Sequence, residues 1–427
     1  MKFPWLALIA GAALAPVAFT ATARADDVTG AAVIQHYGDL AAAMYGDALA
    51  AALDLQKAVD AFVAAPSADT LTVARQAWIA SRPWYQQTEG FRFGNAIVDD
   101  WEGRVNAWPL DEGLIDYVDT KSYGDSSDEN PLYVANVIGS KEIRVGNDTV
   151  DVSTITPDVL KNLQEAGGVE SNVAIGYHAV EFLLWGQDLN GTGPGAGNRA
   201  ATDFDVNNCT NGNCDRRAAY LKSATDLLVA DLQEMVANWQ TGAAARKDLD
   251  AKGEEGGLAT ILTGLGSLSY GELAGERMKL GLILHDPEEE HDCFSDNTHN
   301  SHYYDEAGMV TIYSGSYTRR DGSALDGPGI GDLAAAKAPD KAAALDALMA
   351  DALAKLKAVK DKGDSGAMAY DQMIGDGNAD GNALVQAAID GLVAQTHGIE
   401  AVVADLKLAI TVEGSDSLDN PSAVTTE

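Results

Sequence analysis

Apolar residues recur three and four positions apart over several long stretches of the chain. This spacing is typical of helices that bury one face. The first half shows it over 31–65, 70–87 and 172–185, with Ser171 placed to cap the third helix. The second half shows it over 216–239, 257–286, 330–362 and 383–410. Because alternating patterns that would indicate strands are few, the chain predicts an all-α protein.

Polar and glycine-rich segments separate these helices. Residues 191–215 form the clearest boundary, and 100–150 and 287–330 are irregular and polar. Each half contains a long helix, a second helix, a polar segment and two further helices. We therefore expect two four-helix-bundle-like domains related by duplication, the first over 26–190 and the second over 216–412. Residues 191–215 would connect them, and 413–427 would form a flexible tail.

The N-terminus has the features of a secretory signal. Lys2 precedes an apolar run over 3–19, and Ala23 and Ala25 are the small residues that a signal peptidase recognises. The run is short for a transmembrane helix, so 1–25 is expected to be a cleaved signal peptide. The first cysteine is Cys209, which argues against a lipid anchor. We expect a periplasmic protein with no transmembrane segment after cleavage.

Charge and cysteine content narrow the function. The chain has 29 Lys and Arg against 64 Asp and Glu, a net charge of −35 over 427 residues. Such an acidic protein is not expected to bind nucleic acid, which needs a basic face. In an oxidising compartment Cys209 and Cys214 are expected to form a small disulfide loop, with a metal pair as the alternative.

The first candidate for chemistry is the pair His178 and Glu181. Residues three apart on a helix share a face, and the surrounding residues are apolar nearly all round. Burying an imidazole and a carboxylate is costly unless they are paired or coordinated. The spacing alone supports a metal site and a hydrogen-bonded structural pair equally.

Two further segments contain candidate ligands. Four of the seven histidines lie between His285 and His302, among acids that include Glu290 and Asp296. Glu89 lies in an aromatic segment that also contains Arg82. A loop over 376–381 imitates a calcium loop, but Ala387 stands where a calcium-binding Glu would be needed, which favours an ordinary connection.

The sequence resembles the imelysin family of bacterial envelope proteins. Gly176–Glu181 is similar to the family's Gly-x-His-x-x-Glu signature. Arg82–Gly94 and Ala107–Asp111 resemble further family motifs, and Glu290–His299 resembles a segment of the iron-regulated branch. The resemblance implies two helical bundles, a role in iron acquisition and a metal site at the signature. The family is also named as a metallopeptidase group, but His-Glu-x-x-His is missing here.

These observations lead to one principal expectation and two alternatives. We expect a metal-binding protein that holds iron through His178 and Glu181, with a further carboxylate from Glu89, Glu290 or Asp296 in that order. Such ligands also accept zinc, copper, manganese or calcium. An iron-transport component of the inner or outer membrane is the expected partner. The alternatives are a metallopeptidase, and a non-catalytic module that binds a ligand in the interdomain cleft.

Overall fold

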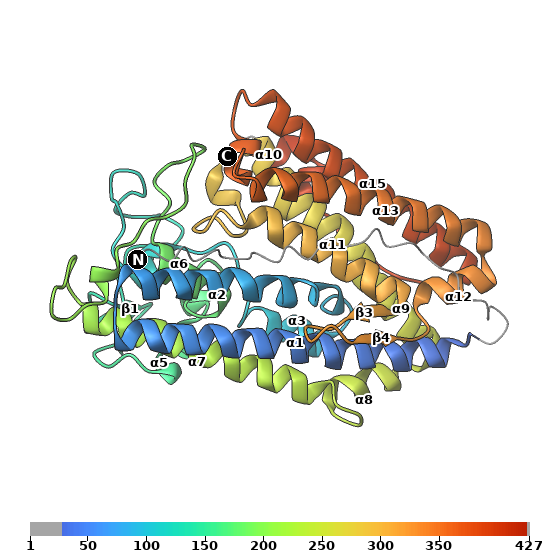
Figure 1. The fold of residues 1–427 in the computed structure, drawn as a ribbon, viewed down its shortest axis with the longest axis horizontal. Coiled ribbons are helices and arrows are strands. Elements are labelled where there is room, and N and C mark those ends of the chain that lie inside the picture. The colour runs from blue at the N-terminus through green and yellow to red at the C-terminus, as the bar shows by residue number, and fades with distance from the viewer. Residues whose placement is uncertain (1–27, 425–427) are drawn as a thin grey trace, which may run out of the picture.

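The computed structural model describes residues 28–424, and the predicted signal peptide lies outside them. Within that part of the chain the only sheets are two short antiparallel hairpins: β1 (Glu142–Val145) with β2 (Asp148–Asp151), and β3 (Ser316–Thr318) with β4 (Ala324–Asp326). Helices form the rest of the framework (Figure 1). The all-α prediction is confirmed.

The first bundle is formed by helices that pack pairwise around an apolar core. They are α1 (Gly30–Ala64), α2 (Ala68–Gln86), α6 (Gly176–Trp185) and α7 (Cys214–Asn238). Helix α2 begins where Ser67 accepts a hydrogen bond from the backbone N–H of Thr70 while the Thr70 hydroxyl accepts one from the N–H of Ser67. The start of α7 is tied to the preceding loop by the Cys209–Cys214 disulfide, as predicted.

The second bundle contains a long helix that changes its winding part way along. Helix α9 (Gly253–Ser267) continues as the π-helix η4 (Leu268–Lys279) and then as α10 (Leu280–Leu284). It packs with α11 (Thr298–Ser314), α13 (Pro339–Asp364) and α15 (Ala379–Leu406). The two bundles meet where α11 contacts α2 and where α9 contacts α1 (Figure 1).

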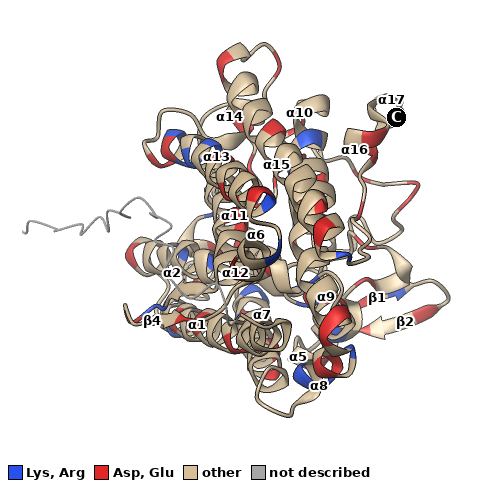
Figure 2. Ribbon diagram, turned by 90° about the vertical axis from the view of Figure 1, so that its right-hand side faces the viewer, with Lys and Arg blue, Asp and Glu red and all other residues tan. Residues whose placement is uncertain are grey.

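Short elements complete the chain between these helices. They are η1 (Glu89–Phe91), α3 (Ala96–Glu102), α4 (Glu112–Ile115), α5 (Pro157–Leu163), η2 (Ala166–Gly168), η3 (Ala201–Asp203), α8 (Ala244–Ala251), η5 (Pro287–Glu289), α12 (Ile330–Lys337), α14 (Tyr370–Ile374), α16 (Asp416–Asp419) and α17 (Pro421–Val424). Asp and Glu positions are distributed over the helices of both bundles (Figure 2). No helix in the described part is long and apolar enough to cross a membrane.

Helix α6 begins later than the sequence predicted. Its N-cap is Ile175, while the Ser171 hydroxyl donates to Asp111 at 2.7 Å instead of capping the helix. Gly176 has a φ of +87°, and a Cβ at this position would lie 2.6 Å from the backbone oxygen of Val105. The signature therefore needs glycine here, because only glycine lets the start of α6 approach that backbone.

The region 287–330, expected to be irregular, contains the 17-residue helix α11. The apolar periodicity is weak because the buried face of α11 carries polar groups, among them His302, Asp305 and Glu306. Asp305 and Glu306 find partners on other helices, in Arg277 and Gln395. Such long-range pairing leaves no local pattern in the sequence.

Two predicted boundaries also differ from the packing. Residues 216–238 were assigned to the second bundle, but they belong to α7, which packs against α1 and α6. We therefore propose that the first bundle extends to Asn238. The predicted flexible tail is held against η4 at α16. The hydroxyl of Ser417 donates to the backbone oxygen of Gly275 at 3.0 Å, and that of Tyr270 donates to Asp419 at 2.7 Å.

Candidate metal centre

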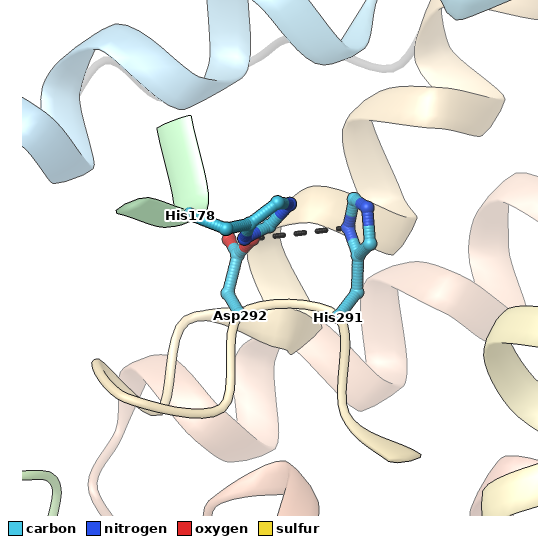
Figure 3. Close-up of side chains that lie close together, drawn as sticks. All are labelled: His178, His291 and Asp292. Carbon is cyan, nitrogen blue, oxygen red and sulfur yellow. Dashed lines mark ion pairs between the residues drawn. The ribbon is translucent and has the colours of Figure 1, made fainter. Parts of the chain in front are cut away.

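Three side chains from the two bundles converge at one buried position. His178 comes from α6, and His291 and Asp292 come from the segment between η5 and α11 (Figure 3). One possible ligand atom from each lies within 4.8 Å of the other two. Asp292 Oδ1 is 3.9 Å from His178 Nδ1 and 3.7 Å from His291 Nδ1. It is the only such group found within residues 28–424.

Burial keeps both imidazoles neutral. His178 and His291 are each 1% exposed. Burial, reinforced by the positive charge of Arg82, lowers the pKa of His178 to about 3. Burial and the charge of Arg277 lower the pKa of His291 well below its usual value. Each ring therefore has a free lone pair near neutral pH, which is the form that binds a metal.

Asp292 remains ionised because its oxygens are heavily hydrogen-bonded. Arg82 Nη2 lies 2.8 Å from Oδ1, and Asn297 Nδ2 donates to Oδ2 at 2.8 Å. The Ser301 hydroxyl also donates to Oδ2. Burial alone would raise the pKa of Asp292, but the charge of Arg82 and these hydrogen bonds hold it below its usual value. The centre therefore contains a carboxylate and two neutral imidazoles.

Glu181 supports His178 from beside the centre. Its Oε2 lies 3.1 Å from His178 Nδ1, and its Oε1 accepts hydrogen bonds from the backbone N–H and the hydroxyl of Ser295 at 3.0 and 2.7 Å. A carboxylate that bonds one ring nitrogen fixes the orientation of the ring and directs the other nitrogen to a metal. Burial and the nearby Asp292 charge raise the pKa of Glu181 well above its usual value, and a cation bound to His178 would oppose this shift and favour the carboxylate.

The nitrogens that remain have no partner within the described residues. Both His178 Nε2 and His291 Nδ1 are buried without a hydrogen bond. Buried polar atoms without partners are rare because each costs free energy. A cation bound beside Asp292 would satisfy these nitrogens, so the residues present fit a metal ion.

Arg82 connects the centre to the first bundle. Its Nη1 donates to Asn106 Oδ1 at 2.7 Å, which turns the Asn106 amide nitrogen towards His291 Nε2 at 3.5 Å. The guanidinium also lies 4.9 Å from the centre of the Tyr177 ring. Arg82 thus positions both Asp292 and Asn106.

The three carboxylates predicted as further ligands lie outside the group that surrounds His178. Glu89 lies in η1 and pairs with Arg277 at 2.7 Å. Glu290 precedes His291 but lines a small cavity with Asp188 and Cys293. Asp296 follows in the same loop, with a φ of +55°. None of these three belongs to the compact group, which contains His291 and Asp292 instead.

The sequence does not single out His291 and Asp292 as candidate ligands, for a simple reason. They lie in a loop, where no helical spacing relates them to His178. The concentration of histidines between His285 and His302 was the available signal, but it does not distinguish which imidazole faces α6.

The fold and this group define a helical protein with a buried candidate metal centre between two bundles. The chain belongs to the imelysin family, whose model it matches over residues 41–399. This confirms the family resemblance seen in the sequence.

A curated relative and a solved structure carry related names. Iron-regulated protein A of Synechococcus elongatus is 39% identical over 71 residues, which are 16% of this chain and 20% of that protein. The match thus spans about a fifth of the relative's length. A crystal structure from Parabacteroides distasonis, described as that of a candidate iron-regulated protein A precursor, superposes with a TM-score of 0.61. It is 16% identical, covers 88% of this chain and 94% of its own, and therefore supports the fold.

Proposed function

We propose that His178, His291 and Asp292 bind a transition-metal ion, with Glu181 orienting the His178 ring. The observation that supports this proposal is the pair of unpartnered buried nitrogens beside an ionised carboxylate. Two imidazoles and one carboxylate form the ligand set that non-haem iron(II) sites use. The same set also accepts zinc, copper or manganese, so the ligands alone do not select iron.

The role that we infer is iron binding in the periplasm for uptake. The signal-like N-terminus and the family membership support it, and the curated relative and the solved structure are both described as iron-regulated. Delivery to an iron-transport component of the inner or outer membrane would complete this role.

The alternative is a metallopeptidase, which the family name Peptidase_M75 suggests. Such an enzyme needs a metal-bound water and a free base beside it. Glu181 is fully buried, and its two oxygens already contact His178 and Ser295. This arrangement favours binding over hydrolysis. A peptidase would instead show chelator-sensitive cleavage of an unfolded substrate that is lost in Glu181→Gln.

Metal titration of the mature protein tests the proposal. Metal-free wild type is expected to bind one equivalent of iron(II) under anaerobic conditions. His291→Ala and Asp292→Asn should weaken binding by about a hundredfold or more, and Glu181→Gln by about 10–100-fold. His397→Ala, which removes an exposed histidine, is the matched control and should bind as wild type does. Equal affinity in wild type and His291→Ala would overturn the assignment.

A further inference from the structure

A second concentration of acidic residues lies next to the candidate metal centre and has no basic partner within residues 28–424. A pocket of about 400 Å³ is lined by Trp108 and two tyrosines, and by five carboxylates: Asp111, Glu112, Asp188, Glu288 and Glu289. No Lys or Arg lines it. We call this the acidic pocket. A cavity of about 10 Å³ shares Asp188, Glu288, Cys293 and Phe294 with it and is also lined by Glu290.

The carboxylates of the acidic pocket repel one another. Within residues 28–424 none of the five forms an ion pair with Lys, Arg or His, in contrast to Asp292 with Arg82. Burial and the neighbouring Glu288 raise the pKa of Glu112 to about 8. Burial and the charges of Asp286 and Asp188 raise the pKa of Glu288 to about 7. A cation from outside the chain would relieve this repulsion.

Glu290 provides an independent sign of a ligand. It is 1% exposed, and its Oε2 has no hydrogen-bond partner. Glu290 also lines the cavity of about 10 Å³, which has room for one ion or one water molecule. The acidic pocket supplies room for the water shell that a hard cation retains.

We propose that Glu290 and the acidic pocket form a second cation site, distinct from the His178, His291 and Asp292 centre. Its donors are carboxylate oxygens, which suit hydrated divalent cations such as calcium or manganese. The site adjoins the centre through Trp108, whose Nε1 donates to the backbone oxygen of Glu290 at 2.9 Å and whose ring centre lies 5.9 Å from that of His291. The inference does not rest on the proposed function.

Terbium(III) is the probe for this site, because it prefers oxygen ligands and emits when nearby Trp or Tyr rings are excited. At physiological salt, which screens diffuse attraction to exposed acids, wild type should show one saturable equivalent of sensitised terbium. Glu290→Gln, which is nearly isosteric, should weaken this binding at least tenfold. Glu288→Gln in the acidic pocket should also weaken it. Glu400→Gln, an exposed change on α15, should leave it unchanged.

Two outcomes would overturn the second site. Identical titrations of wild type, Glu290→Gln and Glu288→Gln would show that the acidic pocket does not bind the ion. Loss of the terbium site in His178→Ala would show that the two sites are one. If wild type binds terbium but no iron(II), the proposed iron-binding function is wrong while the second cation site remains supported.

Discussion

Two groups of carboxylates lie close together in this protein and differ in their partners. Between the bundles, Asp292 pairs with Arg82, while Glu89 and Asp305 pair with Arg277. In the acidic pocket, Glu112, Glu288 and their neighbours have no basic partner among the described residues. The first group receives its positive charge from within the chain, whereas the second must be protonated or bind a cation. The comparison shows that a buried acid alone does not indicate a metal ligand.

Removing the buried positive charge of Arg277 should give the largest loss of stability. Arg277 is 2% exposed and contacts Glu89, Glu272 and Asp305. Arg277→Met removes the basic partner of Glu89 and Asp305, while Glu272 keeps Arg92. We therefore expect a loss of about 3–5 kcal/mol in the free energy of unfolding, measured with denaturant. Lys279→Met on the same helix is the control, since Lys279 only bonds Gln386. Equal losses in both variants would remove the distinction between the two groups.

The pH dependence of stability should report the acidic pocket. The pKa of Glu112 is about 8 in the folded chain, raised by burial and Glu288, against 4.5 for an ordinary glutamate. The folded state therefore binds more protons between these values, and wild type loses stability as pH rises from about 5 to about 8. Glu112→Gln should remove this contribution, so the variant gains about 3 kcal/mol relative to wild type across that range.

Thermal or denaturant unfolding at several pH values measures this difference. Glu142→Gln on the exposed strand β1 serves as the matched control, and its curve should run parallel to that of wild type. If the difference in free energy of unfolding between wild type and Glu112→Gln stays constant from pH 5 to 8, the pKa of Glu112 is not raised by burial without a basic partner.

An added divalent cation should stabilise the folded protein by binding at the acidic pocket. Calcium at a hundredfold its dissociation constant is expected to raise the free energy of unfolding by about 2.7 kcal/mol, because it binds only the folded chain. The gain should shrink strongly in Glu290→Gln and persist in Glu400→Gln. An equal calcium effect in the two variants would assign the stabilisation to diffuse binding on the acidic surface.

An exposed ion pair should have the smallest effect. Lys222 lies 2.9 Å from Asp60, and both side chains are about half exposed. Because water screens this pair, Lys222→Ala should change the free energy of unfolding by no more than about 1 kcal/mol. A loss comparable to that of Arg277→Met would mean that pairing matters equally at the surface and in the interior.

Some features of this protein follow from the sequence alone. The apolar spacing that predicted the helices is a local property, because residues three and four apart share a face whatever lies beyond. The same argument placed His178 and Glu181 together inside an apolar helix, and both are buried there, 3.1 Å apart. The Cys209–Cys214 loop is equally local.

Only the tertiary structure decided what these side chains face. Asp305 and Glu306 occupy the buried side of α11 because Arg277 and Gln395 reach them from other helices. His291 and Asp292 meet His178 across 113 and 114 residues of chain, and Glu89 is turned to Arg277 instead. Contacts of this kind depend on how helices pack, and packing brings together residues whose separation in sequence has no fixed period. Local sequence therefore determined the helices, while the packing of the two bundles determined the partner of each buried charge.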